Sequence, residues 1–174
     1  MNLVSIILLA ALAVLIISTW AKGFQRRPRI FSLENVAEGV ALEGQKSFLA
    51  TAAHAARFLL VKKGADGYHI AVAGTGDDVI GISEDTPGAA EDQTSVALFG
   101  AAKGTRRVAT TGAFNFNTLL VPDATATGLA RALPATSGTY RVIGRSLNLG
   151  ATEATDVVEF VPFDYVFVTV EEAS

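Results

Sequence analysis

The sequence predicts a mainly β protein, a small β-sandwich or barrel-like domain preceded by one apolar N-terminal α-helix. Two observations lead to this prediction. Residues 3–20 form an apolar run without a single charge. From about residue 34 the chain consists of short apolar runs separated by Gly, Pro, Asp and Thr, the pattern of many short strands joined by turns. We therefore expect an apolar helix over residues 1–20, a basic linker over 21–33 and a β-rich domain over 34–174.

The N-terminal run reads LVSIILLAALAVLIISTW and ends at Trp20, an aromatic residue suited to a membrane interface. Its length is close to the ~20 residues that cross a bilayer core. Three interpretations stay open: a membrane anchor, a cleaved signal peptide, and a helix that packs between subunits. A signal peptide usually begins with positive charge, whereas only Met1 and Asn2 precede this run. For an anchor, the basic residues that follow would leave the domain on the cytoplasmic side.

The linker, residues 21–33, contains Lys22, Arg26, Arg27 and Arg29. Pro28 disfavours a helical conformation at the residue before it, so we expect an extended segment. From residue 30 onward the chain has ten basic and seventeen acidic residues, a net charge of about −7. An acidic domain is a poor ligand for phosphate backbones, which argues against nucleic acid as a partner. The sequence contains no cysteine, which excludes disulfides, thiolate zinc sites and a cysteine nucleophile.

The β-rich domain is expected to contain a series of short strands. They are Arg57–Lys62, Tyr68–Ala73, Val79–Ser83, Ser95–Phe99, Thr105–Thr110, Thr118–Val121, Tyr140–Ser146, Asp156–Val161 and Tyr165–Val170. The segment Gly64–Gly67 (GADG) predicts a hairpin turn between the first two. The alanine-rich segment Ala50–Ala56 predicts a short helix.

A weak internal repeat supports this architecture. Val79-Ile80-Gly81 begins one strand–loop–strand unit whose second strand centres on Val96. Val142-Ile143-Gly144 begins another, whose second strand centres on Val158. We interpret the two as one unit used twice, with the glycines marking close backbone approach or a bulge.

No segment of the sequence predicts an active site. His54 and His69 lie in separate segments without metal-ligand spacing, and His69 is expected to face solvent or a subunit contact. Asp77-Asp78 and Glu84-Asp85 lack the alternating ligands of a calcium loop. Gly74-Thr75-Gly76 lacks the third glycine and the βαβ setting of a dinucleotide site. The protein is therefore not expected to be an enzyme, and no cofactor or metal is expected.

Contacts with a partner are the remaining way for this domain to act. Arg106 and Arg107, with Lys103, predict either a solvated edge strand or a surface for an acidic partner. Phe114 and Phe116 are candidate apolar anchors for a partner. Further candidates are Phe163, Phe167 and the loops Thr86–Gln93 and Thr111–Thr118, although each aromatic residue also fits a core position.

Several segments, in order, resemble a family of phage capsid decoration (cement) proteins. They are Asn35–Gly39 (NVAEG), Arg57–Gly64 (RFLLVKKG), Val79–Ile82 (VIGI), Val96–Gly100 (VALFG), Lys103–Thr105 (KGT), Tyr140–Arg145 (YRVIGR) and Asp156–Phe160 (DVVEF). The resemblance spans residues from about 35 to 170, and the apolar N-terminal run departs from the family pattern.

The resemblance implies a virion structural protein without catalytic residues. Such a protein would bind the outside of an assembled capsid, bridge neighbouring capsomers and stabilise the shell. Its partners would be the major capsid protein and copies of itself, and residues 3–20 would add a contact with a membrane or with other subunits. The alternative function is a single-pass, membrane-anchored β-domain that binds a partner in a cell.

Overall fold

A computed structural model describes residues 44–172 apart from 75, 102, 126 and 150–155. The chain divides into two units, Met1–Ser32 and Leu33–Ser174, and every described residue belongs to the second. The helix predicted over residues 1–20 and the linker predicted over 21–33 lie outside the described residues. Within the part of the chain that is described, no helix has the length and apolar character to cross a membrane.

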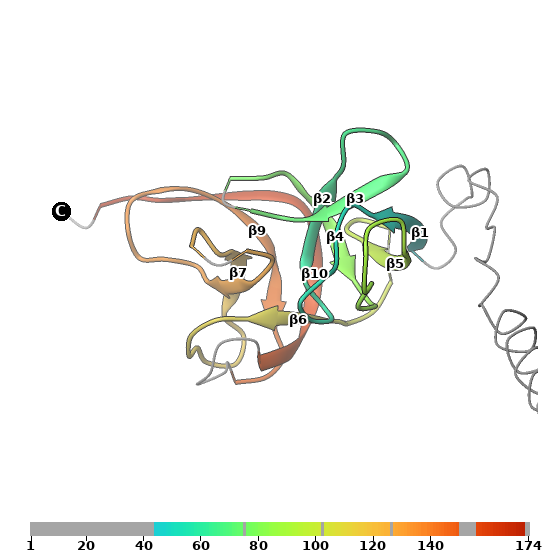
Figure 1. Ribbon diagram of the computed structural model, residues 1–174. Coiled ribbons are helices and arrows are strands. Elements are labelled where there is room, and N and C mark those ends of the chain that lie inside the picture. Colours follow the sequence, from blue (N-terminus) through green and yellow to red (C-terminus); the bar gives the residue numbers. More distant parts are fainter. Residues whose placement is uncertain (1–43, 75, 102, 126, 150–155, 173–174) are drawn as a thin grey trace, which may run out of the picture. The chain divides into compact units, whose positions relative to one another are not determined.

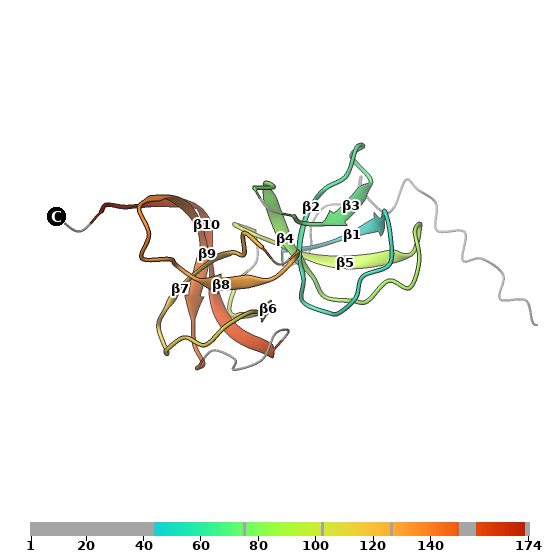
Figure 2. The ribbon, with the colours of Figure 1, turned by 60° about the vertical axis from the view of Figure 1, so that its left-hand side comes forward.

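Ten strands form the described part of the chain (Figure 1). They are β1 (Gln45–Ala50), β2 (Leu60–Lys63), β3 (His69–Val72), β4 (Val79–Ser83), β5 (Gln93–Leu98), β6 (Arg106–Thr110), β7 (Leu119–Pro122), β8 (Ala130–Ala132), β9 (Gly138–Ser146) and β10 (Asp156–Val170). They close two barrels, a first barrel in the order β1-β3-β2-β4-β5 and a second in the order β10-β6-β8-β7-β9 (Figure 2). The prediction of a mainly β, barrel-like domain is confirmed, with two barrels where the sequence predicted one small domain.

The second barrel repeats the topology of the first. β1 pairs in parallel with β3, as β6 does with β8, and the other pairings are antiparallel. The register repeats as well, because Ser83 lies opposite Val96 in the first barrel and Ser146 lies opposite Phe160 in the second. The predicted repeat is therefore present, although Phe160 rather than Val158 holds the position equivalent to Val96.

Gly81 and Gly144 hold equivalent positions in the two barrels, as the repeat predicted. A Cβ atom on Gly81 would lie 2.3 Å from the carbonyl oxygen of Ala97, and one on Gly144 would lie 2.3 Å from that of Val161. No real Cβ atom approaches an oxygen so closely, so each strand needs glycine where the neighbouring strand crosses it.

The residue two positions before β2 and the residue two positions before β7 both have a left-handed backbone conformation. Phe58 and Asn117 have φ angles of 62° and 67°. Their backbone N–H groups donate hydrogen bonds to the carbonyl oxygens of Ser83 (2.8 Å) and Ser146 (3.0 Å). A left-handed phenylalanine is unfavourable by itself, so its presence at Phe58 indicates that the surrounding barrel imposes this turn.

The two barrels share one hydrophobic core. Its buried members are Leu60, Ala73, Val79 and Ile82 from the first barrel and Val108, Leu120, Ala130, Ile143, Val158 and Phe160 from the second. Backbone hydrogen bonds also cross between them. Gly128 accepts from the N–H of Leu60 (2.8 Å) and donates to the carbonyl oxygen of Ala73 (2.7 Å), and the N–H of Ala109 donates to that of Phe58 (2.9 Å). The barrels are therefore expected to unfold together.

One element of the second barrel has no counterpart in the first. β4 begins at Val79 and β5 ends at Leu98, whereas β9 begins before the equivalent Val142 and β10 continues beyond the equivalent Pro162. The register of β10 with β9 shifts after Pro162 and continues with Val166 opposite Val142. We call residues 138–142 and 166–170 the C-terminal ribbon; Figure 1 shows it leading to the C-terminus.

The structure corrects three predictions about secondary structure. The helix predicted over Ala50–Ala56 is wrong: β1 ends at Ala50, and an irregular segment follows in which the N–H of His54 donates to the carbonyl oxygen of Pro87 (2.9 Å). Strands β1 and β8 were not predicted. The last two predicted strands are one strand, β10, with a register shift near the expected break.

Candidate interaction surface

Arg106 and Arg107 lie at the start of β6, beside a hollow of about 400 Å³. Arg57 lines the same hollow, and its guanidinium lies 4.9 Å from the centre of the Phe58 ring. Glu84 and Glu159 are part of the wall and bring two carboxylates close to the three guanidinium groups. The net charge of the wall is therefore small and positive, which suits one acidic side chain better than a polyanion.

The two candidate phenylalanines have different environments. Phe114 is partly buried and packs against the shared core, so its contribution is to stability. Phe116 is 61% exposed in the loop between β6 and β7. Neither lines the hollow that holds Arg106 and Arg107, so the four predicted contact residues do not form one site.

Exposed apolar side chains are concentrated on the second barrel. Of the large apolar residues that are exposed in the described part of the chain, only Tyr68 belongs to the first barrel. The second barrel contributes Phe116, Leu149, Val157, Val161, Val166 and Phe167. Because the barrels have the same topology, the fold itself does not account for this difference. Exposed apolar residues that are concentrated in one part of a protein are typical of a region that contacts another molecule.

Phe116 and Leu149 lie on loops that are tied together at one end of the second barrel. The N–H of Asn117 donates to the carbonyl oxygen of Ser146 (3.0 Å), and the guanidinium of Arg145 donates to the side-chain oxygen of Asn117 (3.0 Å). These bonds hold the Phe116 loop beside the start of the Leu149 loop. Leu149 is 71% exposed and was not predicted as a contact residue, because an isolated leucine in a loop carries no sequence signal of its own.

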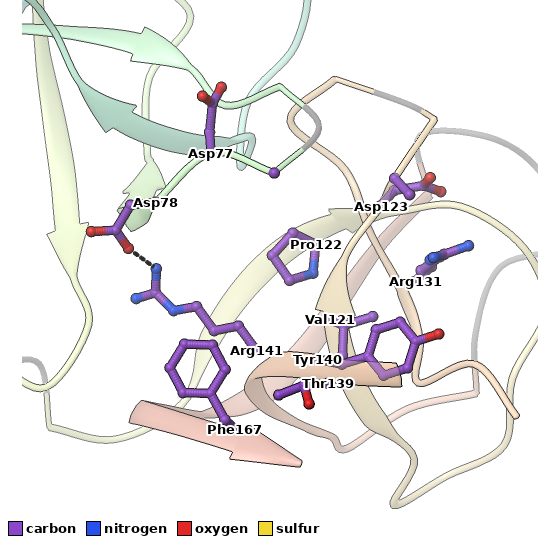
Figure 3. A pocket seen from close by; sticks show the side chains of 12 residues that line it. Asp77, Asp78, Val121, Pro122, Asp123, Arg131, Thr139, Tyr140, Arg141 and Phe167 are labelled. Atoms are coloured by element: carbon purple, nitrogen blue, oxygen red, sulfur yellow. Dashed lines mark hydrogen bonds and ion pairs between the residues drawn. The ribbon is translucent and has the colours of Figure 1, made fainter. Parts of the chain in front are cut away.

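A second hollow, of about 470 Å³, lies where the C-terminal ribbon meets the first barrel. Asp77 and Asp78, in the turn before β4, form part of its wall, and Tyr140, Arg141 and Phe167 of the ribbon form another part (Figure 3). Arg141 and Asp78 form an ion pair between the two barrels. This ion pair at the hollow therefore holds the ribbon against the first barrel.

His54 is buried and has a structural role. Ser83 Oγ donates its single proton to the carbonyl oxygen of Asp85 (2.8 Å), so the proton between His54 Nδ1 and Ser83 Oγ (3.1 Å) must come from the histidine. Burial lowers the pKa of His54, which keeps the ring neutral. The ring thus ties the irregular segment after β1 to strand β4.

The sequence predicted that His69 faces solvent or a subunit contact; in the structure its ring lies between two carboxylates of the same chain. Its Nδ1 lies 2.8 Å from a carboxylate oxygen of Asp66, and its Nε2 lies 3.0 Å from one of Glu91. Asp66 also accepts the N–H groups of Tyr68 and His69 (2.9 Å each) in the GADG hairpin, which the structure confirms. The hydrogen bonds that the ring donates to Asp66 and Glu91 raise the pKa of His69. A protonated His69 therefore links the β2–β3 turn to the β4–β5 loop.

Replacing His69 by glutamine is expected to lower stability at mildly acidic pH and to have little effect in the alkaline range. A raised pKa in the folded state means that the protonated ring stabilises the fold below its unfolded pKa of about 6.5, and that this stabilisation is lost as pH rises through the folded pKa. Urea unfolding of both proteins across this range tests the prediction. The contribution of His54 to stability changes with pH in the opposite sense. It is the same in both proteins, so it cancels in the difference between their free energies of unfolding. A difference that is constant with pH would contradict it.

The described residues contain no group of three or more His, Cys, Asp or Glu side chains placed to hold a metal ion. Ser83, the serine beside His54, is fully buried, so this pair is not accessible to a substrate. The described surface offers apolar contact area on the second barrel and a hollow lined by Arg57, Arg106 and Arg107.

Comparison with known proteins assigns the chain neither to a family nor to a function. No family model matches the chain, and no curated protein matches it.

Proposed function

We propose that the protein is a virion structural protein of the decoration type, which binds the outer surface of an assembled capsid and stabilises the shell. The observation that carries this proposal is the concentration of exposed apolar side chains on one of two barrels with the same topology. The first barrel and the shared core provide stability, and the second barrel provides the surface that meets the capsid. The resemblance in sequence to decoration proteins points to the same function.

Contact energy in this proposal comes from a few aromatic and aliphatic side chains. Phe116 and Leu149 at the end of the second barrel are suited to fill pockets on a partner, since buried aromatic residues dominate interface energetics. The arginine-lined hollow would take one acidic side chain at the rim. One copy gives modest affinity, and several copies on a repetitive shell multiply it without new contacts.

Residues 1–20 complete the proposal as an apolar helix that provides a second attachment. The eighteen uncharged residues 3–20 would bury apolar surface in lipid or between subunits. The same feature favours the alternative function, a single-pass protein anchored in a cellular membrane.

Fractionation of a lysate of the source organism distinguishes the two functions. Density-gradient centrifugation separates assembled particles from membranes, and an antibody against residues 44–172 locates the protein. A decoration protein is expected in the particle band, on the outside of the shell in electron micrographs. Recovery in the membrane fraction alone, released by detergent, would overturn the proposal in favour of the membrane-anchored alternative.

Replacing Phe116 and Leu149 by serine is expected to weaken rebinding to stripped particles by about tenfold or more, the effect of losing a hot-spot residue. Both side chains are more than half exposed, so the fold should be unchanged. Tyr68→Ser, on the first barrel, is the matched control and is expected to bind like the wild type. If Tyr68→Ser weakened rebinding as much as the serine substitutions at Phe116 and Leu149, the second barrel would not be the specific contact surface.

A further inference from the structure

The arginine-lined hollow beside β6 is formed by residues of both barrels. The first barrel contributes the residue before the left-handed turn, the turn residue itself and the residue after β4: Arg57, Phe58 and Glu84. The second contributes the start of β6 and one residue of β10: Thr105, Arg106, Arg107 and Glu159. The hollow has a volume of about 400 Å³, which is room for a side chain of another molecule.

Two contacts hold Arg57 in place at this hollow. Its Nε donates to the main-chain carbonyl oxygen of Glu84 (2.9 Å), and its guanidinium lies 4.9 Å from the centre of the Phe58 ring. These contacts use one edge and one face of the planar group. Within the described residues, no group accepts a hydrogen bond from the terminal nitrogens of Arg57. The end of the side chain is therefore positioned and still able to donate.

The residue that supports Arg57 has an unfavourable backbone conformation. Phe58 has a φ of 62°, and Asn117, at the equivalent turn of the second barrel, has a φ of 67°. Asparagine tolerates this conformation, whereas phenylalanine does not. The second barrel shows that the turn itself does not need an aromatic residue. The Phe58 ring packs against the shared core and carries the Arg57 guanidinium, which links the strain to the hollow.

Arg107 is the second guanidinium at the hollow that is able to bind a ligand. Glu159 lies opposite it in the ladder of β6 and β10, but the hydroxyl of Thr105 donates to the carboxylate of Glu159. In the described part of the chain, neither Arg57 nor Arg107 forms an ion pair. Two guanidinium groups thus line one hollow without a carboxylate partner from the same chain.

The charges of the wall select the ligand. The planar fork of a guanidinium group matches the two oxygens of a carboxylate or a phosphate. Three arginines and two glutamates line the hollow, which gives the wall a formal charge of +1. One negative charge balances it, whereas Glu84 and Glu159 would repel a ligand with several. A carboxylate therefore fits this wall better than a phosphate or a polyanion.

We propose that this hollow is a carboxylate-binding site. Arg57 and Arg107 hold a carboxylate of a partner polypeptide, and Phe58 is the positioning residue for Arg57. The carboxylate belongs to an acidic side chain or to the C-terminus of the partner chain. The inference rests on the proposed function, which gives the hollow a contact at the rim, and adds the chemical group that the hollow selects.

Titration of the isotope-labelled full chain with short peptides tests this proposal by NMR. The protein is kept in a nonionic detergent, which adds no charge. One peptide has a single glutamate among glycines and both ends blocked. A second has glutamine in its place and a free C-terminal carboxylate, and a third has glutamine and both ends blocked. Saturable shifts of the amide signals of Phe58 and Arg107 are expected with the first or the second peptide and not with the third.

The comparison of the first two peptides identifies the source of the carboxylate. Absence of saturable shifts with both peptides would overturn the proposal. Pyrophosphate is expected to bind no more tightly than the better peptide, because the wall contains two glutamates. Binding of pyrophosphate about tenfold tighter would show a general polyanion patch and would also overturn it. No particles are used, so this result is independent of the fractionation that tests the proposed function.

Single charge changes separate a site from general attraction to a basic surface. Arg57→Gln and Arg107→Gln are each expected to weaken binding about tenfold, the effect of losing one charged hydrogen-bond donor. Lys63→Gln removes the same charge from an exposed residue that does not line the hollow and should bind like the wild type.

Glu84→Gln removes a like charge from the wall and leaves the main-chain carbonyl that holds Arg57. It is expected to strengthen binding about threefold, a gain that a misfolded variant would not show. Equal loss in Lys63→Gln and Arg107→Gln, or no gain in Glu84→Gln, would mean that the peptides do not bind in this hollow.

Discussion

Replacing Gly144 by alanine is expected to destabilise the protein by about 3 kcal/mol, the upper end of the usual cost of overpacking. The added Cβ atom would lie 2.3 Å from the carbonyl oxygen of Val161 and 2.4 Å from the Phe160 ring. The oxygen belongs to the paired strand β10, so it cannot move without opening the ladder between β9 and β10. Gly81→Ala is expected to have a similar effect, since its Cβ would lie 2.3 Å from the carbonyl oxygen of Ala97.

Urea unfolding measured for the variants and the wild type tests this prediction. Gly67→Ala is the matched control: it makes the same substitution in the β2–β3 turn, where an added Cβ would meet no atom within 4 Å. Its stability is expected to stay within about 0.5 kcal/mol of the wild type. If Gly144→Ala were as stable as Gly67→Ala, strands β9 and β10 would not be as close as the structure has them.

Phe160→Ala is expected to cost about 3–5 kcal/mol, the usual range for removing a buried aromatic ring. Phe160 is fully buried in the core that both barrels share. Its ring meets that of Phe99 edge to face, with centroids 6.4 Å apart and planes at 84°. Phe99 follows β5 in the first barrel. The substitution therefore removes a contact between the barrels and also leaves a cavity within the second barrel.

Phe116→Ala removes the same side chain from a position that is 61% exposed and serves as the control. It is expected to change stability by less than about 0.5 kcal/mol. The unfolding curves also test whether the shared core couples the barrels. A single transition is expected for both variants, whereas two separate transitions in Phe160→Ala would show that each barrel folds by itself.

The strands with a high content of β-branched residues were predictable from local propensity, and the two missed strands were not. β4, VIGIS, has the bounds that the sequence predicted. β1, QKSFLA, contains polar residues and leads into an alanine-rich segment, and β8 has only the residues ARA. Both are strands because a barrel needs them to close, a long-range requirement that local propensity does not contain.

The internal repeat was the signal that could have found them. The equivalent of β1 is β6 and the equivalent of β8 is β3, and both equivalents were predicted. Carrying each predicted strand to the other repeat would therefore have placed all five strands in both barrels.

The contact residues were less predictable than the fold. Phe114 and Phe116 are two positions apart and look alike in sequence, yet one packs on the core and the other is exposed. Which phenylalanine faces inward depends on the path of the loop, which the bonds of Asn115, Asn117 and Ser146 determine. The His69 link was hidden for the same reason, because Glu91 reaches it from a loop far along the chain.

The repeat joins two barrels of the same topology in one chain, and that has a consequence for how the sequence can change. A symmetric homodimer alters both of its faces with every substitution. Here the two halves vary separately, so one barrel can keep a polar exterior while the other acquires apolar contacts and an added ribbon. If the second barrel provides the contact surface, as proposed, substitutions on the outside of the first barrel should be neutral for attachment, and adaptation to a new partner should be confined to the second.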